Sequence, residues 1–421
     1  MSQQVESADI IPKSKKFSKA IARVAVVALL MMIAVLALAW TALYLYHVPV
    51  PDLDGAAPVD RGVASVDHAE TITTAREMLL QARTELAAPS VSIAVARDGQ
   101  LVWSEAVGYA SLGDRKLATV KTAYPIGSVS KAITATLTMD IAEEGLIDID
   151  KDVRDYVPTF PQKRYPVTLR QLLSHQGGIR HYGFAFAFPT FSEAGYNVEF
   201  STSAQALAIF EDDPLLFEPD SDFSYSTFGY TLAGSALEGA TNQSFLELLD
   251  QRVFEPLGMD DSGPERPDVF GERLASGYVS LLSRNQVMPA PKTNHSYKWA
   301  GGGLASTPSD LARFGSSLLS GQILEQATRE EMFAIRKTSD GAFNEQHYAL
   351  GWRNGGLENG ENTYRMINHG GATAGATAIL LIFPDQSIVV AMTANTVRAG
   401  GSNQIMKKAA RIATVFLQAS D

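Results

Sequence analysis

The pattern of apolar and polar positions begins with one long apolar run. Residues 24–46 contain no charge, and the polar segment 1–23 before them is rich in lysine and arginine. As a helix this run would be about 34 Å long, enough to cross a hydrocarbon core of about 30 Å. The basic cluster therefore predicts a cytoplasmic tail (1–23), a transmembrane anchor (24–46) and an extracytoplasmic remainder. The alternative is a signal peptide cleaved at Ala37-Leu38-Ala39, but the length of the run favours an uncleaved anchor.

The next segment lacks periodicity. Residues 47–66 are rich in Pro, Gly, Ala and Asp, which predicts a linker before a domain at 67–421. Apolar positions at helical spacing predict a helix over 69–86. Alternating apolar residues on both sides of Asp98-Gly99 predict an antiparallel hairpin over 91–108.

The remaining pattern divides into a helical middle and a strand-rich end. A buried helix is predicted where Val129, Ile133, Leu137 and Ile141 recur before Gly145. Strands at both ends of the domain with helices between them predict an α+β fold, an antiparallel sheet with an inserted, mostly helical subdomain at about 152–275. The predicted middle helices are 167–174, 203–210, 227–241 and 245–253; the later strands are 348–353, 364–369, 376–383 and 387–394, before a closing helix at 402–418.

Composition excludes several function classes. The chain of 421 residues is 46% hydrophobic and 19% charged, as expected of a core-forming globular protein. Its net charge of -11 argues against a nucleic-acid partner. Cysteine is absent, so no disulfide, thiol nucleophile or thiolate metal site can form. None of the seven histidines stands in a His-Glu-x-x-His arrangement, and we expect neither a metal nor another cofactor.

The first candidate for chemistry is the pair Ser128 and Lys131 at the start of the buried helix. Residues three apart lie on one helix face, so the lysine can reach the serine hydroxyl. A serine becomes nucleophilic when a nearby base takes its proton, and a lysine serves as that base only while its amine is neutral. The helix N-terminus favours developing negative charge and disfavours an ammonium. Taken alone, the same spacing also describes an ordinary solvated pair.

Two other segments could complete such a site. Tyr225 precedes the helix predicted at 227–241 and could direct its phenol into a cleft, although an aromatic residue packed under a loop is the simpler interpretation. The stretch His369-Gly370-Gly371-Ala372 ends one predicted strand, and two glycines at a sheet edge allow another backbone to approach closely.

Together these segments, in the order Ser-x-x-Lys, Tyr-x-(Asn), His-x-Gly, resemble the penicillin-recognising serine hydrolases. The resemblance is to the group of class C β-lactamases, D-alanyl-D-alanine carboxypeptidases, D-aminopeptidases and esterases, and covers the chain from Ala69 onward. The form of residues 225–230 is most similar to mitochondrial serine β-lactamase-like proteins and their bacterial relatives. Further matching stretches are Pro125–Gly127, Thr168–Ile179, Phe254–Met259, Gly301–Leu304 and Thr307–Asp310.

The resemblance implies a β-lactamase-like fold and hydrolysis of an amide, peptide or ester bond through an acyl-serine. Ser128 would be the nucleophile, and Lys131 and Tyr225 the base and proton relay, with their division of labour left open. The backbone N–H groups of Ser128 and Ala372 would form the oxyanion hole. Substrate-binding residues would be Thr227, His369, Gly370, Gly371 and Ala372.

The sequence departs from the usual family pattern at three of these positions. Most members have asparagine at the position of Thr227, the β-lactamases have lysine at that of His369, and Gly370 lacks a hydroxyl that they use near the antibiotic carboxylate. These differences argue against efficient β-lactam hydrolysis. A true β-lactamase and a non-catalytic module for cell-wall peptide binding or assembly remain the alternatives. A Ser-His-Asp hydrolase is disfavoured because the chain has no Gly-x-Ser-x-Gly motif.

The expected location and partners follow from the anchor and the resemblance. The chain is predicted to be a single-pass protein of the inner (plasma) membrane with a periplasmic or other extracytoplasmic catalytic domain. The mitochondrial intermembrane space is the alternative, although Glu6 and Asp9 make a poor transit peptide. Expected partners are a small-molecule, peptide or ester substrate and the lipid bilayer, through residues 24–46. The sequence leaves the oligomeric state open.

Overall fold

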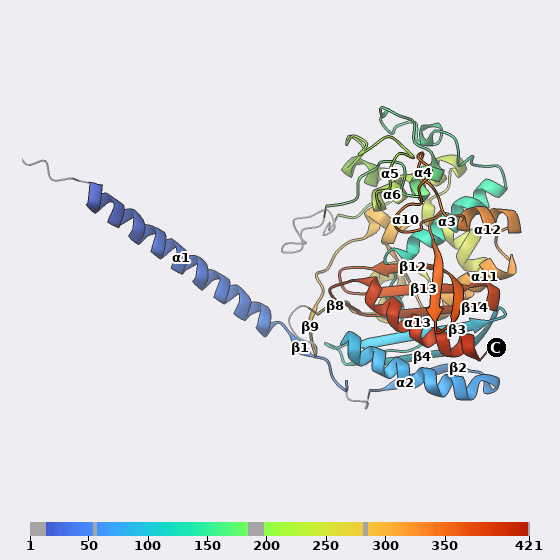
Figure 1. Cartoon of the computed structure of the whole chain (residues 1–421), viewed down its shortest axis with the longest axis horizontal. Helices are drawn as coiled ribbons and strands as arrows, with labels where there is room; N and C mark the ends of the chain where they lie inside the picture. The colour runs from blue at the N-terminus through green and yellow to red at the C-terminus, as the bar shows by residue number, and fades with distance from the viewer. Residues whose placement is uncertain (1–13, 54–56, 184–197, 281–284, 420–421) are drawn as a thin grey trace, which may run out of the picture. The chain divides into compact units, whose positions relative to one another are not determined.

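The computed structural model describes residues 14–53, 57–183, 198–280 and 285–419 (Figure 1). The chain divides into two units, Met1–Val48 and Pro49–Asp421. The first contains helix α1 (Ser14–Leu45), in which Ile21–Leu38 is long and apolar enough to cross a membrane, with a mean hydropathy of 2.7. A signal sequence near an N-terminus passes the same test. Part of the predicted tail, residues 1–13, lies outside the described residues.

The second unit is built on an antiparallel sheet that is completed from both ends of the chain. The C-terminal strand β14 (Ile388–Ala394) pairs with the N-terminal strand β3 (Ser90–Arg97), with Ala391 opposite Ala94. This pairing confirms the predicted α+β architecture. In spatial order the strands are β11 (Arg353–Asn359), β12 (Asn362–Ala372), β13 (Thr377–Phe383), β14, β3, β4 (Gln100–Ser111) and β2 (Val59–Ala64), with β5 (Lys116–Leu117) paired to β4.

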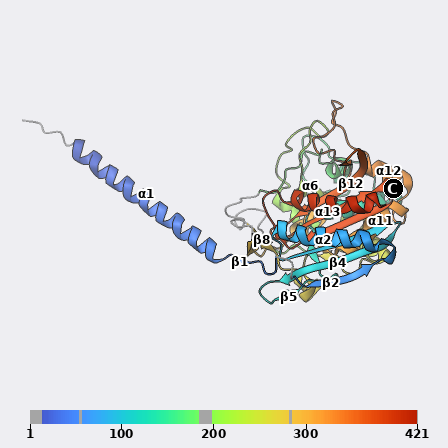
Figure 2. The same cartoon turned by 60° about the horizontal axis from the view of Figure 1, so that its bottom comes forward.

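Helices cover both faces of this sheet, which explains why its central strands are apolar throughout. Helices α2 (Ala69–Leu86) and α13 (Ser402–Gln418) lie side by side over one face (Figure 2). Helices α3 (Val129–Glu143) and α11 (Pro308–Ser320) pack on the other face. Because α3 is enclosed between the sheet and the helical region, both its polar and its apolar side chains are buried. This helix carries Lys131 into the interior.

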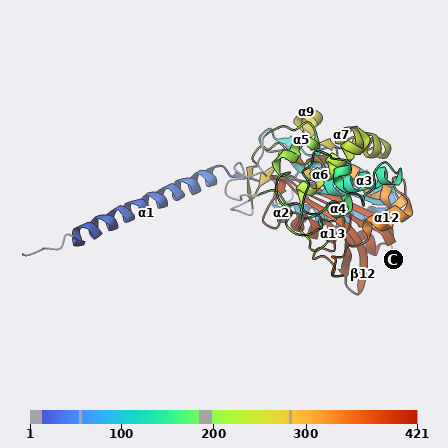
Figure 3. The same ribbon diagram turned by 90° about the horizontal axis from the view of Figure 1, so that it is seen from above.

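The helical region lies beyond α3 (Figure 3). As predicted, the described residues between 152 and 260 contain helices and no strand. The helices of this span are α4 (Leu169–Leu173), α5 (Ser203–Ala206), α6 (Thr227–Thr241), α7 (Phe245–Leu249) and α8 (Glu255–Leu257). Helices α9 (Pro267–Phe270), α10 (Trp299–Gly302) and α12 (Gln326–Phe333) follow later in the chain. The short strands are β1 (Val48–Pro49), β6 (Tyr124–Pro125), β7 (Gly263–Pro264), β8 (Tyr278–Val279), β9 (Gln286–Pro289), β10 (Leu304–Ser306) and β15 (Thr396–Val397).

One predicted strand is wrong. Residues 348–353 were expected to be extended, but β11 begins only at Arg353, and Tyr348 forms an isolated bridge with that residue. The intervening chain turns back at Gly351, whose φ of +80° is accessible to glycine and costly for other residues. The apolar residues of this turn are buried, and a short buried apolar run has the same sequence pattern as a buried strand.

Much of the segment predicted as a linker is packed against the domain, at residues 50–53 and 57–64. Strand β2 pairs with the edge of β4. The buried Arg83 donates hydrogen bonds to the carbonyls of Pro51 (2.7 Å) and Asp52 (2.6 Å). Strand β2 is mostly exposed, so neither of its faces needs apolar residues, and its pairing contains a register shift. For these reasons the sequence does not show the alternation that predicts a strand.

Candidate active site

Ser128 and Lys131 lie where the chain turns from strand β6 into helix α3. Ser128 is the N-cap residue of α3, and Lys131 occupies its first turn. Gly127 makes the turn with a φ of +50°. Lys131 is fully buried, and its Nζ lies 3.3 Å from Ser128 Oγ. The predicted spacing therefore places the two groups within hydrogen-bond reach.

The Lys131 amine has two further partners, so three oxygen atoms surround it. Nζ lies 3.0 Å from Thr227 Oγ1 and donates a short hydrogen bond to the carbonyl oxygen of Gly301. A neutral amine has two N–H donors for these oxygens and one lone pair, which can accept the Ser128 hydroxyl proton. Burial, followed by the positive charges of Lys298 and Arg353, lowers the pKa of Lys131 well below its usual value. No carboxylate ion pair opposes this shift among the described residues.

Tyr225 lies just before helix α6 and faces the same amine. The Lys131 Nζ is 4.8 Å from the centroid of its ring. Burial raises the pKa of the Tyr225 phenol to about 12, although the Arg353 charge and a hydrogen bond with Ser128 lower it. The phenol is therefore protonated at neutral pH. A protonated phenol can pass a proton between neighbouring groups but is a poor initial base.

Two histidines hold the start of helix α6 beside Lys131. The N–H of Ser226 donates to His175 Nδ1 (3.1 Å), and the N–H of Thr227 donates to His181 Nδ1 (3.0 Å). Each histidine therefore accepts a hydrogen bond through Nδ1. Burial, with smaller effects of the Lys131 and Lys298 charges, lowers the pKa of His181 to about 3. These contacts fix the position of Thr227 Oγ1 opposite the lysine.

Strand β12 closes the other side of the site through a backbone contact. A Cβ added at Gly371 would stand 1.8 Å from the carbonyl oxygen of Ile126 and 2.9 Å from the nitrogen of Ser128. A Cβ at Gly127 would stand 2.8 Å from the nitrogen and the oxygen of Ala372. Two glycines thus allow the backbone of β12 to approach the backbone before α3. The backbone nitrogens of Ser128 and Ala372 both lie at this contact.

His369 and Gly370 point to opposite faces of β12. His369 is fully buried; its Nδ1 pairs with the carbonyl of Gly370 (2.9 Å), so Nε2 accepts the hydroxyl proton of Tyr348 (2.8 Å). Burial, followed by the Arg353 and Lys131 charges, lowers the pKa of His369 well below its usual value. Gly370 faces helix α13, where an added Cβ would stand 2.8 Å from Ser402 Oγ. The structure therefore turns the His369 ring into the protein interior.

Several groups that the sequence did not assign contribute to the site. One is the carbonyl of Gly301, a backbone acceptor. In the sequence, only the glycine run 301–303 drew attention to this segment. Lys298 is 6% exposed, with its Nζ 5.0 Å from the ring centroid of Tyr182. The Arg353 guanidinium lies 5.8 Å from the ring centroid of Tyr225. Neither cation forms an ion pair in the part of the chain that the structure describes. No sequence signal indicates that these two positions face Lys131.

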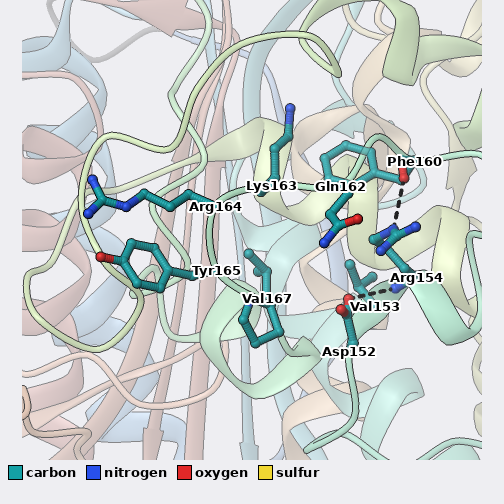
Figure 4. A pocket seen from close by; sticks show the side chains of 10 residues that line it. Asp152, Val153, Arg154, Phe160, Gln162, Lys163, Arg164, Tyr165 and Val167 are labelled. Carbon is teal, nitrogen blue, oxygen red and sulfur yellow. Dashed lines mark hydrogen bonds between the residues drawn. The ribbon is translucent and has the colours of Figure 1, made fainter.

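One cavity borders the candidate active site, and a second lies away from it. A cavity of about 420 Å³ borders Arg353, Asn368 and Gly370 at the edge of β12. A smaller cavity of about 100 Å³ lies in the helical region, where Arg154 Nε donates to the carbonyl of Phe160 (Figure 4). None of the predicted site residues lines the smaller cavity. The described residues contain no group of three His, Asp or Glu side chains suited to a metal ion.

This fold, with a serine, a buried lysine and a tyrosine brought together at the edge of its sheet, is that of the β-lactamase-like serine hydrolases. The β-lactamase family model ("Beta-lactamase") matches residues 74–414. The chain belongs to this family and is a serine hydrolase of the β-lactamase and penicillin-binding protein type.

Named relatives agree with this membership. The chain is 29% identical over 403 residues to "Serine beta-lactamase-like protein LACTB, mitochondrial" of Homo sapiens, covering 76% of this chain and 73% of the relative. It is 25% identical over 334 residues to "Penicillin-binding protein 4*" of Bacillus subtilis (strain 168), covering 76% and 71%. Its structure is similar to that of the octameric penicillin-binding protein homologue from Pyrococcus abyssi, with a TM-score of 0.70 and 26% identity over 82% of this chain and 77% of that one.

Proposed function

We propose that Ser128 forms an acyl-enzyme with Lys131 as its base. The observation that carries this proposal is the hydrogen-bond set of Lys131: two fixed acceptors, Thr227 Oγ1 and the Gly301 carbonyl, leave the lone pair of a neutral amine for the Ser128 hydroxyl. The raised pKa of Tyr225 supports a division of roles in which the tyrosine transfers protons.

The reaction proceeds in two halves. Ser128 Oγ attacks the substrate carbonyl carbon while Lys131 takes its proton, and the N–H groups of Ser128 and Ala372 stabilise the oxyanion. The proton passes through Tyr225 to the leaving amine or alcohol as its bond to the carbonyl carbon breaks. Water then attacks the acyl-serine, with its proton returned through Tyr225 and Lys131 to Ser128. The products are a carboxylic acid and the free enzyme.

The substrate that we propose is an amide, peptide or ester in which Thr227 and the 369–372 stretch bind the acyl portion. The exposed edge at Ala372 supports binding of an extended group along β12. Gly370 offers no hydroxyl, and the His369 ring is buried, so neither side chain presents the polar groups that a β-lactam carboxylate would meet in the β-lactamases. These two features support peptidase or esterase activity over β-lactamase activity.

We also propose that residues 24–46 anchor the chain in the inner (plasma) membrane, with 1–23 in the cytoplasm and the 67–421 domain periplasmic. The apolar helix α1 and its basic flank support this topology. The mitochondrial intermembrane space is the alternative, which the name of the human relative favours. Flotation of the full chain with membranes after alkaline extraction, together with protease accessibility of the domain, tests the topology.

A labelled fluorophosphonate tests the chemistry. Wild-type protein should be modified at Ser128, and Ser128→Ala should not be, whereas the exposed Ser221→Ala variant should react as wild type. Turnover of p-nitrophenyl esters, D- and L-amino-acid p-nitroanilides and a chromogenic cephalosporin then ranks the substrate classes. Failure of the wild type to react would exclude the enzymatic role of Ser128. A cephalosporin as the best substrate would overturn the interpretation of Gly370.

A further inference from the structure

We propose that the tether between the anchor and the domain holds the rim of the active site at the membrane surface, so that the enzyme hydrolyses acyl compounds resident in the bilayer. The active-site rim is defined here as residues 372–376, the end of β12 and the turn that follows it. This inference rests on the proposed anchor and adds a substrate class to the proposed function.

The tether is short because the domain binds the chain soon after the apolar run ends. Val50 is buried, and its N–H donates to the carbonyl of Asn285 (2.9 Å). Only residues 47–49 separate Val50 from Tyr46, the last residue of the predicted span. The four Cα–Cα steps reach at most about 14 Å.

The contacts just beyond Val50 make this attachment firm. Arg83 is 2% exposed and donates to the carbonyls of Pro51 and Asp52. The hydroxyl of Tyr109 donates to the Asp52 carboxylate (2.9 Å). Buried charge-assisted hydrogen bonds of this kind are costly to break. The segment 50–52 therefore stays bound to the domain and does not lengthen the tether.

The attachment point lies close to the active-site rim. Val50 packs in one apolar cluster with Tyr278 and Val287 of the small sheet β8–β9. The N–H of Tyr278 then donates to the carbonyl of Gly375, within the rim (2.9 Å). Two neighbouring backbone spacings of about 5 Å, with one side-chain contact, place Val50 within roughly 15 Å of the rim.

The opposite end of β12 lies much farther from the attachment. This strand runs from Asn362 to Ala372, and ten steps of about 3.3 Å separate its ends by about 33 Å. Glu361, in the hairpin turn before β12, therefore marks the end of this strand that lies away from the rim. A tether of at most about 14 Å keeps Val50 close to the bilayer, whereas the Glu361 end is free to lie farther away.

The chemistry that this placement favours is hydrolysis of an ester or amide whose acyl chain is embedded in lipid. Ser128 Oγ would bond to the carbonyl carbon as the alcohol or amine leaves with a proton, and water would release the acid. Holding the rim at the surface raises the effective concentration of such a substrate without any new contact. Soluble esters gain nothing from the tether.

Single-site fluorescent labels test the placement, because the natural chain has no cysteine. Ala374→Cys in the rim and Glu361→Cys at the far end are labelled in the full-length protein, reconstituted in phosphatidylcholine vesicles that contain a headgroup-quencher lipid. We expect strong quenching at position 374 and weak quenching at position 361. Equal quenching, or stronger quenching at 361, overturns the inference. Failure of the protein to float with vesicles instead refutes the anchor itself.

Lengthening the tether tests the consequence for substrates. A flexible Gly/Ser insertion of about ten residues after Tyr46 adds up to ~36 Å of reach. We expect turnover of a long-chain acyl ester embedded in the vesicles to fall several-fold, with turnover of soluble p-nitrophenyl acetate unchanged. The same insertion after Gly360, in the far hairpin, should change neither. An unchanged rate on the embedded ester in the lengthened variant contradicts the proposal.

Discussion

Replacing Gly371 with alanine tests whether the backbone contact between β12 and the Ser128 turn builds the oxyanion hole. The new Cβ would stand 1.8 Å from the Ile126 carbonyl oxygen, a separation that non-bonded atoms do not tolerate. Both partners are backbone, so no side-chain rotation relieves the clash. The two segments must separate by roughly 1 Å, which misplaces the Ala372 N–H relative to Ser128.

The expected loss of kcat/KM follows from the free energy that one oxyanion-hole donor contributes. A backbone donor in an oxyanion hole contributes about 3 kcal/mol to transition-state stabilisation, so kcat/KM for a p-nitrophenyl ester should fall about 10²-fold. Gly355→Ala is the matched control, since the same substitution on neighbouring β11 meets no atom within 4 Å. Its activity should stay within about twofold of wild type.

Thermal unfolding separates this effect from loss of fold. The Gly371→Ala protein should keep a cooperative transition while its fluorophosphonate labelling slows with the ester rate. Gly127→Ala approaches the same contact from the other segment, 2.8 Å from the Ala372 backbone, and should reproduce the defect. Folded variants with kcat/KM near the wild-type value would refute the role of this contact.

Three further predictions concern the Lys131 environment. Because burial, Lys298 and Arg353 lower the pKa of Lys131, the labelling rate of Ser128 should rise as pH increases through that pKa, and Lys298→Met should move this rise to higher pH; an unshifted profile contradicts it. Lys131→Met should abolish labelling yet stabilise the fold. At a pH between its folded and unfolded pKa values, Lys131 is neutral in the folded protein and protonated in the unfolded protein. In urea titrations the free energy of unfolding of Lys131→Met should therefore exceed that of the wild type by about 1.4 kcal/mol more for each pH unit that the pH falls across this range. A difference that does not change with pH contradicts this prediction. Thr227→Val leaves a Lys131 donor unpaired and should cost about 1–3 kcal/mol of stability, measured by the same titrations.

Sequence periodicity predicted the elements that position Ser128. The helices at 69–86, 227–241 and 402–418 have the predicted bounds. In the first and the last of them the buried residues recur at helical spacing, as in a helix that packs one face on a sheet. The turn at Gly351 escaped prediction because residues buried from every side show no period. Strand β2 escaped because an exposed edge strand needs no apolar face.

The candidate site shows a different limit. Ser128 and Lys131 are three residues apart on one helix, so their proximity could be predicted from the sequence. The other hydrogen-bond partners of the lysine come from distant segments, and one of them is a backbone carbonyl that any residue could supply. Lys298, just before α10, and Arg353, at the start of β11, reach the site only through tertiary packing. Their charges could be counted in the sequence, but their positions could not.

The burial of His369 changes how the family's third motif is understood in this chain. A protonated imidazole facing the cleft would offer positive charge to an anionic substrate. Instead Nε2 accepts from Tyr348 and Nδ1 contacts the Gly370 carbonyl, a pattern that satisfies only the neutral ring. The neutral His369 ring therefore packs against Tyr348 and supports β12. Among the described residues, Arg353 is the cation that borders the cavity at this strand and forms no ion pair. If an anionic group binds here, Arg353 is the side chain with charge to offer it, which shifts the electrostatics of the site from the third motif to the start of β11.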